Sequence, residues 1–150
     1  MNSTNVVFSA MEGKNPGLGS FSMAEFNQPR AITDFSDLRF EAKHVLASKA
    51  LIHKTSELQA SVYVLEPGGA IPKHHHGVSW DISIVTRGRI ESSCETTDGI
   101  ETSLCETGSV TVIPPGFKHW ISNPDPVETA SFILIQSPSE GFDFLTEDRG

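Results

Sequence analysis

The chain has 150 residues, of which 37% are hydrophobic, and this size fits one globular domain rather than two. Its formal net charge of -8 argues against nucleic-acid binding, because phosphate contacts need clustered Lys and Arg in excess of the acids. There is neither an apolar run of about 18 residues nor a secretory signal at the start, so we expect a cytoplasmic protein without membrane contact.

Residues 1–36 are expected to form an irregular N-terminal arm. The stretch is rich in Gly, Pro, Ser and Asn and shows no sustained helical or strand period. Two alternatives fit it: a disordered segment, or a segment that lies over a neighbouring surface. Residues 37–150 then form one β domain with a C-terminal tail, which either docks loosely through Phe142, Phe144 and Leu145 or is unstructured.

The remainder of the chain reads as short β-strands. Segments rich in Val, Ile, Thr and Phe alternate with Gly, Pro and Asp, which is typical of an antiparallel β domain. Asp98-Gly99 joins two runs of similar length and predicts a hairpin over 89–105. Near 129–136 both strand faces are apolar, so a second sheet or a second subunit must cover one of them. The predicted strands are 44–53, 60–65, 71–76, 81–87, 89–95, 100–105, 109–113, 119–122 and 129–136.

Two histidines stand two residues apart in one predicted strand. Successive side chains of a strand alternate faces, so His74 and His76 point the same way and His75 points oppositely. Asp81 follows a Gly-containing break, where the chain can turn back and bring a carboxylate beside the imidazole pair. We therefore predict that these three side chains meet.

A third histidine lies far along the chain. His119 follows the turn Pro114-Pro115-Gly116, which would aim it from another strand. Three imidazole nitrogens and one carboxylate oxygen suit Zn, Fe, Mn, Ni or Co, whereas this ligand set contains no thiolate or thioether that would favour a soft metal. We therefore predict one divalent metal ion per chain, without naming which.

The residues around these histidines resemble the cupin superfamily in two motifs. The first family motif is Gly, five residues, His-x-His, three or four residues, Glu, six residues, Gly. The second is Gly, five residues, Pro-x-Gly, two residues, His, three residues, Asn. Here they read Gly68, His74, His76, Asp81 and Gly88, followed by Gly108, Pro114, Gly116, His119 and Asn123.

The resemblance implies a fold, a metal site and an assembly. It predicts an all-β protein, a double-stranded β-helix or jelly-roll barrel, with His74, His76, Asp81 and His119 as metal ligands and a homodimer as the assembly. It does not define a reaction, because cupins carry many. We favour a metal-dependent enzyme that oxidises a small oxygen-rich molecule, as dioxygenases do. The alternatives are a redox-neutral isomerase, cyclase, lyase or decarboxylase, and a non-enzymatic binding or scaffold protein.

One motif position departs from the family pattern. Asp81 stands where the family has Glu, and its side chain is one methylene shorter. It reaches the metal directly if its strand sits closer, or else it acts through water and leaves a three-histidine site.

Two further residues are candidates for a part in catalysis. Tyr63 is the single tyrosine, and inside the barrel its phenol is a candidate general acid or donor to a bound anion. Arg87 shares strand parity with Asp81 and is a candidate contact for a substrate carboxylate. The competing interpretations are packing for Tyr63 and surface exposure for Arg87.

Overall fold

The protein is an all-β barrel, as the sequence predicts. The computed structural model describes residues 28–146, and every strand pair in this part of the chain is antiparallel. Residues 1–27, most of the predicted arm, and the last four residues lie outside the described range. The elements are η3 (Phe35–Asp37), β1 (Glu41–Ala42), β2 (Val45–Lys54), β3 (Gln59–His74), β4 (Trp80–Arg87), β5 (Arg89–Thr96), β6 (Gly99–Glu106), β7 (Val110–Ile113), β8 (His119–Ser122) and β9 (Ala130–Ser137).

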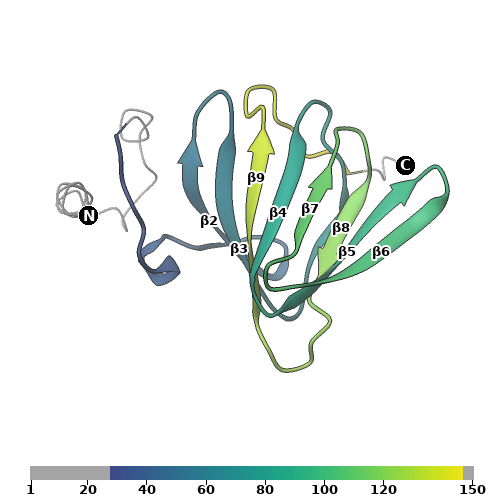
Figure 1. Cartoon of the computed structure of the whole chain (residues 1–150), viewed down its shortest axis with the longest axis horizontal. Helices are drawn as coiled ribbons and strands as arrows, with labels where there is room; N and C mark the ends of the chain where they lie inside the picture. Colours follow the sequence, from purple (N-terminus) through teal and green to yellow (C-terminus); the bar gives the residue numbers. More distant parts are fainter. Residues whose placement is uncertain (1–27, 147–150) are drawn as a thin grey trace.

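The strands form one curved sheet that nearly closes on itself. Its order is β6-β5-β8-β3-β9-β4-β7, and β2 adds to β3 and carries β1. Figure 1 shows how the sheet bends around a concave face. Non-consecutive neighbours such as β3 and β8 bring distant parts of the chain together, which is how the jelly-roll barrel builds an interior site.

The long strand β3 is the main departure from the predicted elements. Segments 60–65 and 71–76 were expected as two strands, but 59–74 form one strand. Its first half pairs with β2 and β9, and its second half pairs with β8. Gly68 adopts a φ of 83°, which lets the strand bend between the two halves without ending. The predicted hairpin over 89–105 is confirmed as β5 and β6.

Two hydrophobic clusters lie on opposite faces of the sheet. Along β3, Tyr63 and Leu65 belong to the interior cluster, whereas Val62 and its neighbour Val64 belong to the second one. Because side chains alternate in a strand, the second cluster is on the outer face. Phe35 and Leu38, which precede β1, pack there. This part of the outer face is therefore covered by the chain's own N-terminal segment rather than by a second sheet.

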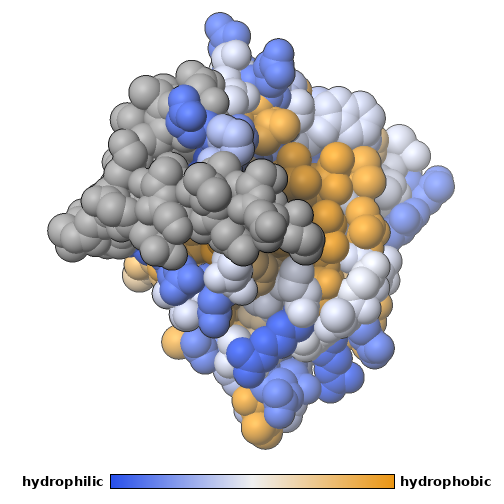
Figure 2. Space-filling model, turned by 60° about the vertical axis from the view of Figure 1, so that its left-hand side comes forward, coloured by the Kyte–Doolittle hydropathy of each residue, from blue (hydrophilic) through white to orange (hydrophobic). Residues whose placement is uncertain are grey.

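Another part of the outer face stays uncovered in the described part of the chain. Val110 and Val112 of β7 are 57% and 54% exposed, and they pair with Ile84 and Ile82 of β4. Figure 2, turned to bring the side with β2 forward, shows hydrophobic residues gathered beside the grey atoms.

Within residues 28–146, no helix has the length and apolar character that crossing a membrane requires.

Candidate metal centre

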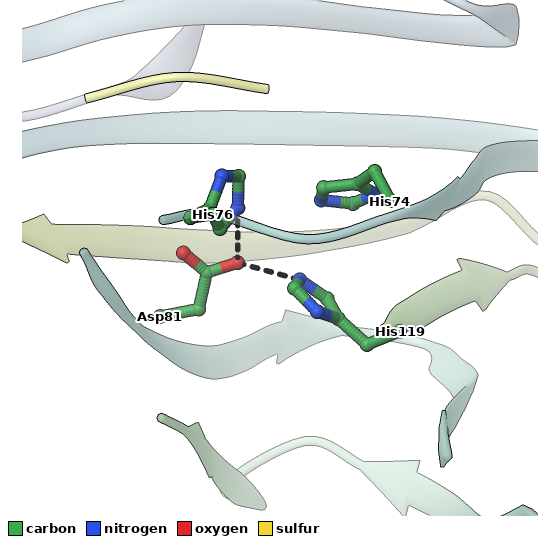
Figure 3. Close-up of side chains that lie close together, drawn as sticks. All are labelled: His74, His76, Asp81 and His119. Carbon is green, nitrogen blue, oxygen red and sulfur yellow. Dashed lines mark hydrogen bonds and ion pairs between the residues drawn. The ribbon is translucent and has the colours of Figure 1, made fainter. Parts of the chain in front are cut away.

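The ends of β3, β4 and β8 bring the four predicted ligands together on the concave face of the sheet. His74 ends β3 and pairs across the sheet with His119, the first residue of β8. His76 lies two residues beyond His74 and points to the same side, and Asp81 comes from the start of β4. Figure 3 shows the three imidazoles and the carboxylate converging on one point. His74 and His76 point the same way because side chains two residues apart in an extended chain lie on one face, as predicted. His75 lies between them and pairs through its backbone with Leu145.

The four side chains form a tight, buried group. Each residue is at most 5% exposed, and each offers one ligand atom within 4.8 Å of all the others. Asp81 Oδ2 lies 3.2 Å from His76 Nε2 and 2.9 Å from His119 Nε2. Asp81 therefore reaches the same point as the histidines despite its shorter side chain.

A backbone carbonyl orients each imidazole. The Nδ1 atoms of His74, His76 and His119 lie 2.7, 2.6 and 2.8 Å from the carbonyl oxygens of Pro72, Asp143 and Phe117. A carbonyl oxygen only accepts, so each Nδ1 carries the proton and each neutral ring presents the lone pair of Nε2 to the centre.

This donor set fits a divalent cation. With the Nδ1 protons committed, an Nε2–H directed at Asp81 would make a buried ring cationic, whereas a metal ion satisfies Nε2 and Oδ2 with neutral rings. Three nitrogens and one oxygen are a ligand set for Zn, Fe, Mn, Ni or Co. The group can therefore bind a metal.

The electrostatics favour the metal-binding protonation states of His74 and Asp81. Burial, followed by the charge of His119, lowers the pKa of His74 to about 3, so this ring is neutral near pH 7. Burial opposes ionisation of Asp81, but the imidazoles of His119 and His76 beside Oδ2 outweigh it and hold the pKa of that carboxyl well below its usual value. Burial also opposes protonation of His76, yet the hydrogen bond and charge of Asp81 raise its pKa, so a metal ion must displace a proton that Asp81 favours on this ring.

A buried chain of amides holds the second oxygen of Asp81. Gln136 donates from Nε2 to Asp81 Oδ1 at 3.0 Å, and Gln59 donates from Nε2 to Gln136 Oε1 at 2.7 Å. Ser139 donates in turn to Gln59 Oε1 at 3.3 Å. Because each amide has its oxygen occupied by the preceding donor, its NH₂ group must face the next acceptor. Oδ1 is thereby engaged, and Oδ2 is left for the centre.

The ligand group opens onto a cavity of about 300 Å³. We call it the site cavity; it is lined by His74, Asp81 and His119 together with charged, aromatic and aliphatic side chains of β2, β3, β8 and β9 and of the C-terminal segment. Its size is at the lower end for small-molecule sites.

The C-terminal segment 139–146 lies against the ligands. The Phe144 ring stacks on His74 with centroids 4.1 Å apart, and Phe142 lies 4.9 Å from His76. Asp143 accepts from the Gly77 backbone N–H at 2.7 Å, in addition to holding His76 through its carbonyl. Of the two alternatives for the tail, docking by the aromatic side chains is the one the structure shows.

The structure separates the two residues predicted to take part in catalysis. Tyr63 lines the site cavity, and burial, followed by the charge of Asp81, raises its pKa to about 12, so the phenol keeps its proton. Arg87 lies at the opposite end of β4 from Asp81, is exposed and does not line the cavity. A shift in pairing register between Val85 and Arg87 interrupts the strand parity on which the Arg87 hypothesis relied.

Sequence reasoning missed Gln136, Lys49 and Phe144. Gln136 shares strand parity with Phe132 and Leu134, so its inward direction could have been found from the predicted last strand. Lys49 stands in a strand with no ligand spacing, and only its pairing with Tyr63 shows that it faces the cavity. The sequence offered docking of the tail through Phe144 as one alternative, but nothing in it indicated that Phe144 docks against His74.

Fold and site together define a jelly-roll barrel with a buried ligand set that could hold a metal ion. The sequence profile of the family described as "Cupin" matches residues 27–147. The chain therefore belongs to the cupin family, and the family resemblance of its two motifs is confirmed. No curated protein matches the chain in sequence.

Solved structures with the same fold are distant in sequence. KdgF from a Halomonas species is 18% identical, with a TM-score of 0.63 over 73% of this chain and 94% of that one. An RmlC-like cupin from Shewanella frigidimarina is 16% identical, with a TM-score of 0.62 over 74% and 93%. An oxalate oxidase is 16% identical, with a TM-score of 0.65 over 87% and 70%. At these identities the likeness shows the fold alone.

Proposed function

We propose that this protein is a metal-dependent enzyme acting on a small oxygen-rich organic molecule, with dioxygenase-like oxidation favoured. The observation that carries the proposal is the buried group His74, His76, Asp81 and His119, which opens onto the site cavity. A closed structural metal site has no such opening. A bound divalent cation would supply Lewis-acid stabilisation of negative charge on a substrate oxygen or, as iron, access to dioxygen.

The chain's own residues contribute orientation, seclusion and a proton. The three carbonyl-held imidazoles and the amide chain behind Asp81 fix the ligand atoms before any substrate arrives. Phe142 and Phe144 cover the site and limit the entry of water. Tyr63 keeps a proton that its phenol oxygen can donate within the cavity.

Two further functions remain as alternatives. In a redox-neutral isomerase, cyclase, lyase or decarboxylase, the same residues would hold a metal that only polarises a carbonyl. The third alternative, a binding or scaffold cupin, would use the same cavity without turnover.

Elemental analysis followed by oxygen measurement separates these functions. Protein purified without chelator or affinity metal is analysed for bound metal, and dioxygen consumption is then followed with candidate substrates. Iron with substrate-dependent oxygen uptake supports oxidation, whereas turnover with a redox-inert metal and no oxygen uptake supports redox-neutral catalysis. Tight binding of a candidate without any chemical change would support the scaffold alternative.

We also propose that two copies pair as a homodimer. The uncovered apolar face of β4 and β7 supports this, because a contiguous apolar patch on a protein surface commonly marks an interface. Light scattering should give twice the chain mass, and Val112→Lys on this face should shift the protein towards the monomer. The control is Val127→Lys in the exposed loop before β9, which should leave the mass unchanged. A monomeric wild-type protein would contradict the proposal.

A further inference from the structure

Two hydrogen-bond donors stand side by side in the wall of the site cavity. Lys49 of β2 and Tyr63 of β3 are directly paired across the two strands, and both line the cavity. The Lys49 ammonium lies 5.7 Å from the centroid of the Tyr63 ring. Each therefore presents its polar end on the same side of the sheet as the metal ligands.

Neither donor is matched to an acceptor. Within residues 28–146, the structure gives neither Lys49 Nζ nor Tyr63 Oη a hydrogen bond or ion pair. A position over an aromatic ring attracts the ammonium, but it leaves the ammonium's N–H donors without acceptors. Both residues line the site cavity, and neither Lys49 Nζ nor Tyr63 Oη is among the fully buried atoms of the described residues that have no partner. The two donors are therefore accessible to an acceptor that enters the cavity.

The charge in the cavity is opposite to that of the whole protein. The chain carries a net charge of -8, yet the described residues that line the cavity include Lys43 and Lys49 and a single acid, Asp81. Asp81 already accepts from Gln136 and is engaged by two imidazoles, so it is not available to either lysine. An anion entering the cavity would thus meet an ammonium that feels the charge of Asp81 but that no hydrogen bond or ion pair engages in the described residues.

The rest of the wall selects an apolar body. Ile71, Ile121 and Leu134 line the cavity, and Phe142 and Phe144 close its side from the C-terminal segment. A ligand without apolar surface would leave these side chains unpartnered, whereas a small hydrocarbon or aromatic body fits both their chemistry and the volume of about 300 Å³.

We propose that the substrate of this site is a small organic acid, whose carboxylate is bound by Lys49 Nζ and Tyr63 Oη and whose apolar body packs against the cavity wall. One carboxylate oxygen accepts from the ammonium and the other from the phenol O–H, a charge-assisted pair of hydrogen bonds. The inference deepens the proposed function by naming its substrate class, and it rests on that function for the idea that the bound acid is transformed.

Benzoate and benzamide are matched probes for this proposal. They have the same shape and the same apolar ring, but only benzoate carries a charge. Calorimetric titration of the full-length protein as purified should show benzoate binding about tenfold more tightly than benzamide, or more. Lys49→Met should remove this preference, Lys49→Arg should keep most of it, and Tyr63→Phe should weaken benzoate binding several-fold.

Lys54→Met is the control, because Lys54 ends the same strand, is exposed and does not line the cavity. It removes the same charge and should change benzoate affinity less than about twofold. Equal binding of the two probes, no binding of benzoate, or equal loss in Lys49→Met and Lys54→Met would overturn the proposal. So would a benzoate preference that survives Lys49→Met in metal-loaded protein, because the carboxylate would then bind the metal instead.

Metal content measured on the same samples keeps the two proposals apart. A protein without metal whose benzoate preference depends on Lys49 would contradict the proposed function and support the acid-binding site. A metal-loaded protein that does not distinguish benzoate from benzamide would contradict the acid-binding site and support the proposed function.

Discussion

The two ends of the barrel interior are built from the same strands and have opposite chemistry. Along β9 the inward side chains run from Phe132 and Leu134 to Gln136, and along β4 they run from Val85 through Ser83 to Asp81. One end is thus a packed apolar core, in which Leu65, Val85, Ile90 and Phe132 are almost fully buried. The other end buries imidazoles, a carboxylate and amides.

The comparison of the two ends explains how the barrel can bury a polar site and remain stable. Burying polar groups without partners costs free energy, and the apolar end offers burial that stabilises the barrel as a whole. At the polar end the cost is limited because the carbonyls of Pro72, Asp143 and Phe117 and the amides of Gln136 and Gln59 supply partners. We therefore expect core substitutions to change stability and polar substitutions to change ligand binding.

The largest expected effect is on stability, at the apolar end. Phe132→Ala should lower the free energy of unfolding by about 3–5 kcal/mol, because it leaves a cavity in the interior cluster beside the stacked Tyr63 ring. Denaturant unfolding measures this. Val127→Ala in the exposed loop before β9 should change it by less than about 0.5 kcal/mol. Similar effects of the two variants would mean that the interior is not the packed core described.

A smaller effect is expected on metal affinity, at the polar end. Gln136→Leu keeps the side-chain size but removes the amide that holds Asp81 Oδ1, and should weaken metal binding by about 10–100-fold. Competition with a chelator of known affinity measures the change. Unchanged affinity would show that the amide chain does not orient Asp81.

The smallest effect is expected when the family's own acid is restored. Asp81→Glu should retain metal, with a loss of metal affinity smaller than the roughly tenfold minimum that is typical when a residue supporting a ligand is replaced. Glu is one methylene longer than Asp, so its carboxylate lies farther from the β4 backbone but still offers one oxygen to the metal and one to Gln136 Nε2. Complete loss of metal would instead show that the local geometry depends on the shorter acid.

Much of the fold could be predicted because its signals are local. Alternating apolar residues and Gly, Pro and Asp punctuation gave most strand positions, and the spacing of His74 and His76 gave the shared face. The unbroken strand through Gly68 could not be predicted, since a glycine that bends a strand and one that ends it look alike. Lys49, Gln136 and Phe144 depend on pairing between distant strands and on the path of the tail, which local patterns do not contain.

The central claim is that the ligand set and not the neighbouring histidine binds metal. His75→Ala is the matched control, because His75 pairs with Leu145 through its backbone and its buried Nδ1 has no partner in the described part of the chain. Metal content should be near one ion per chain in the wild-type protein and in His75→Ala, and near zero in His76→Ala and His119→Ala. Equal metal loss in all three variants, or no metal in the wild-type protein, would contradict the account.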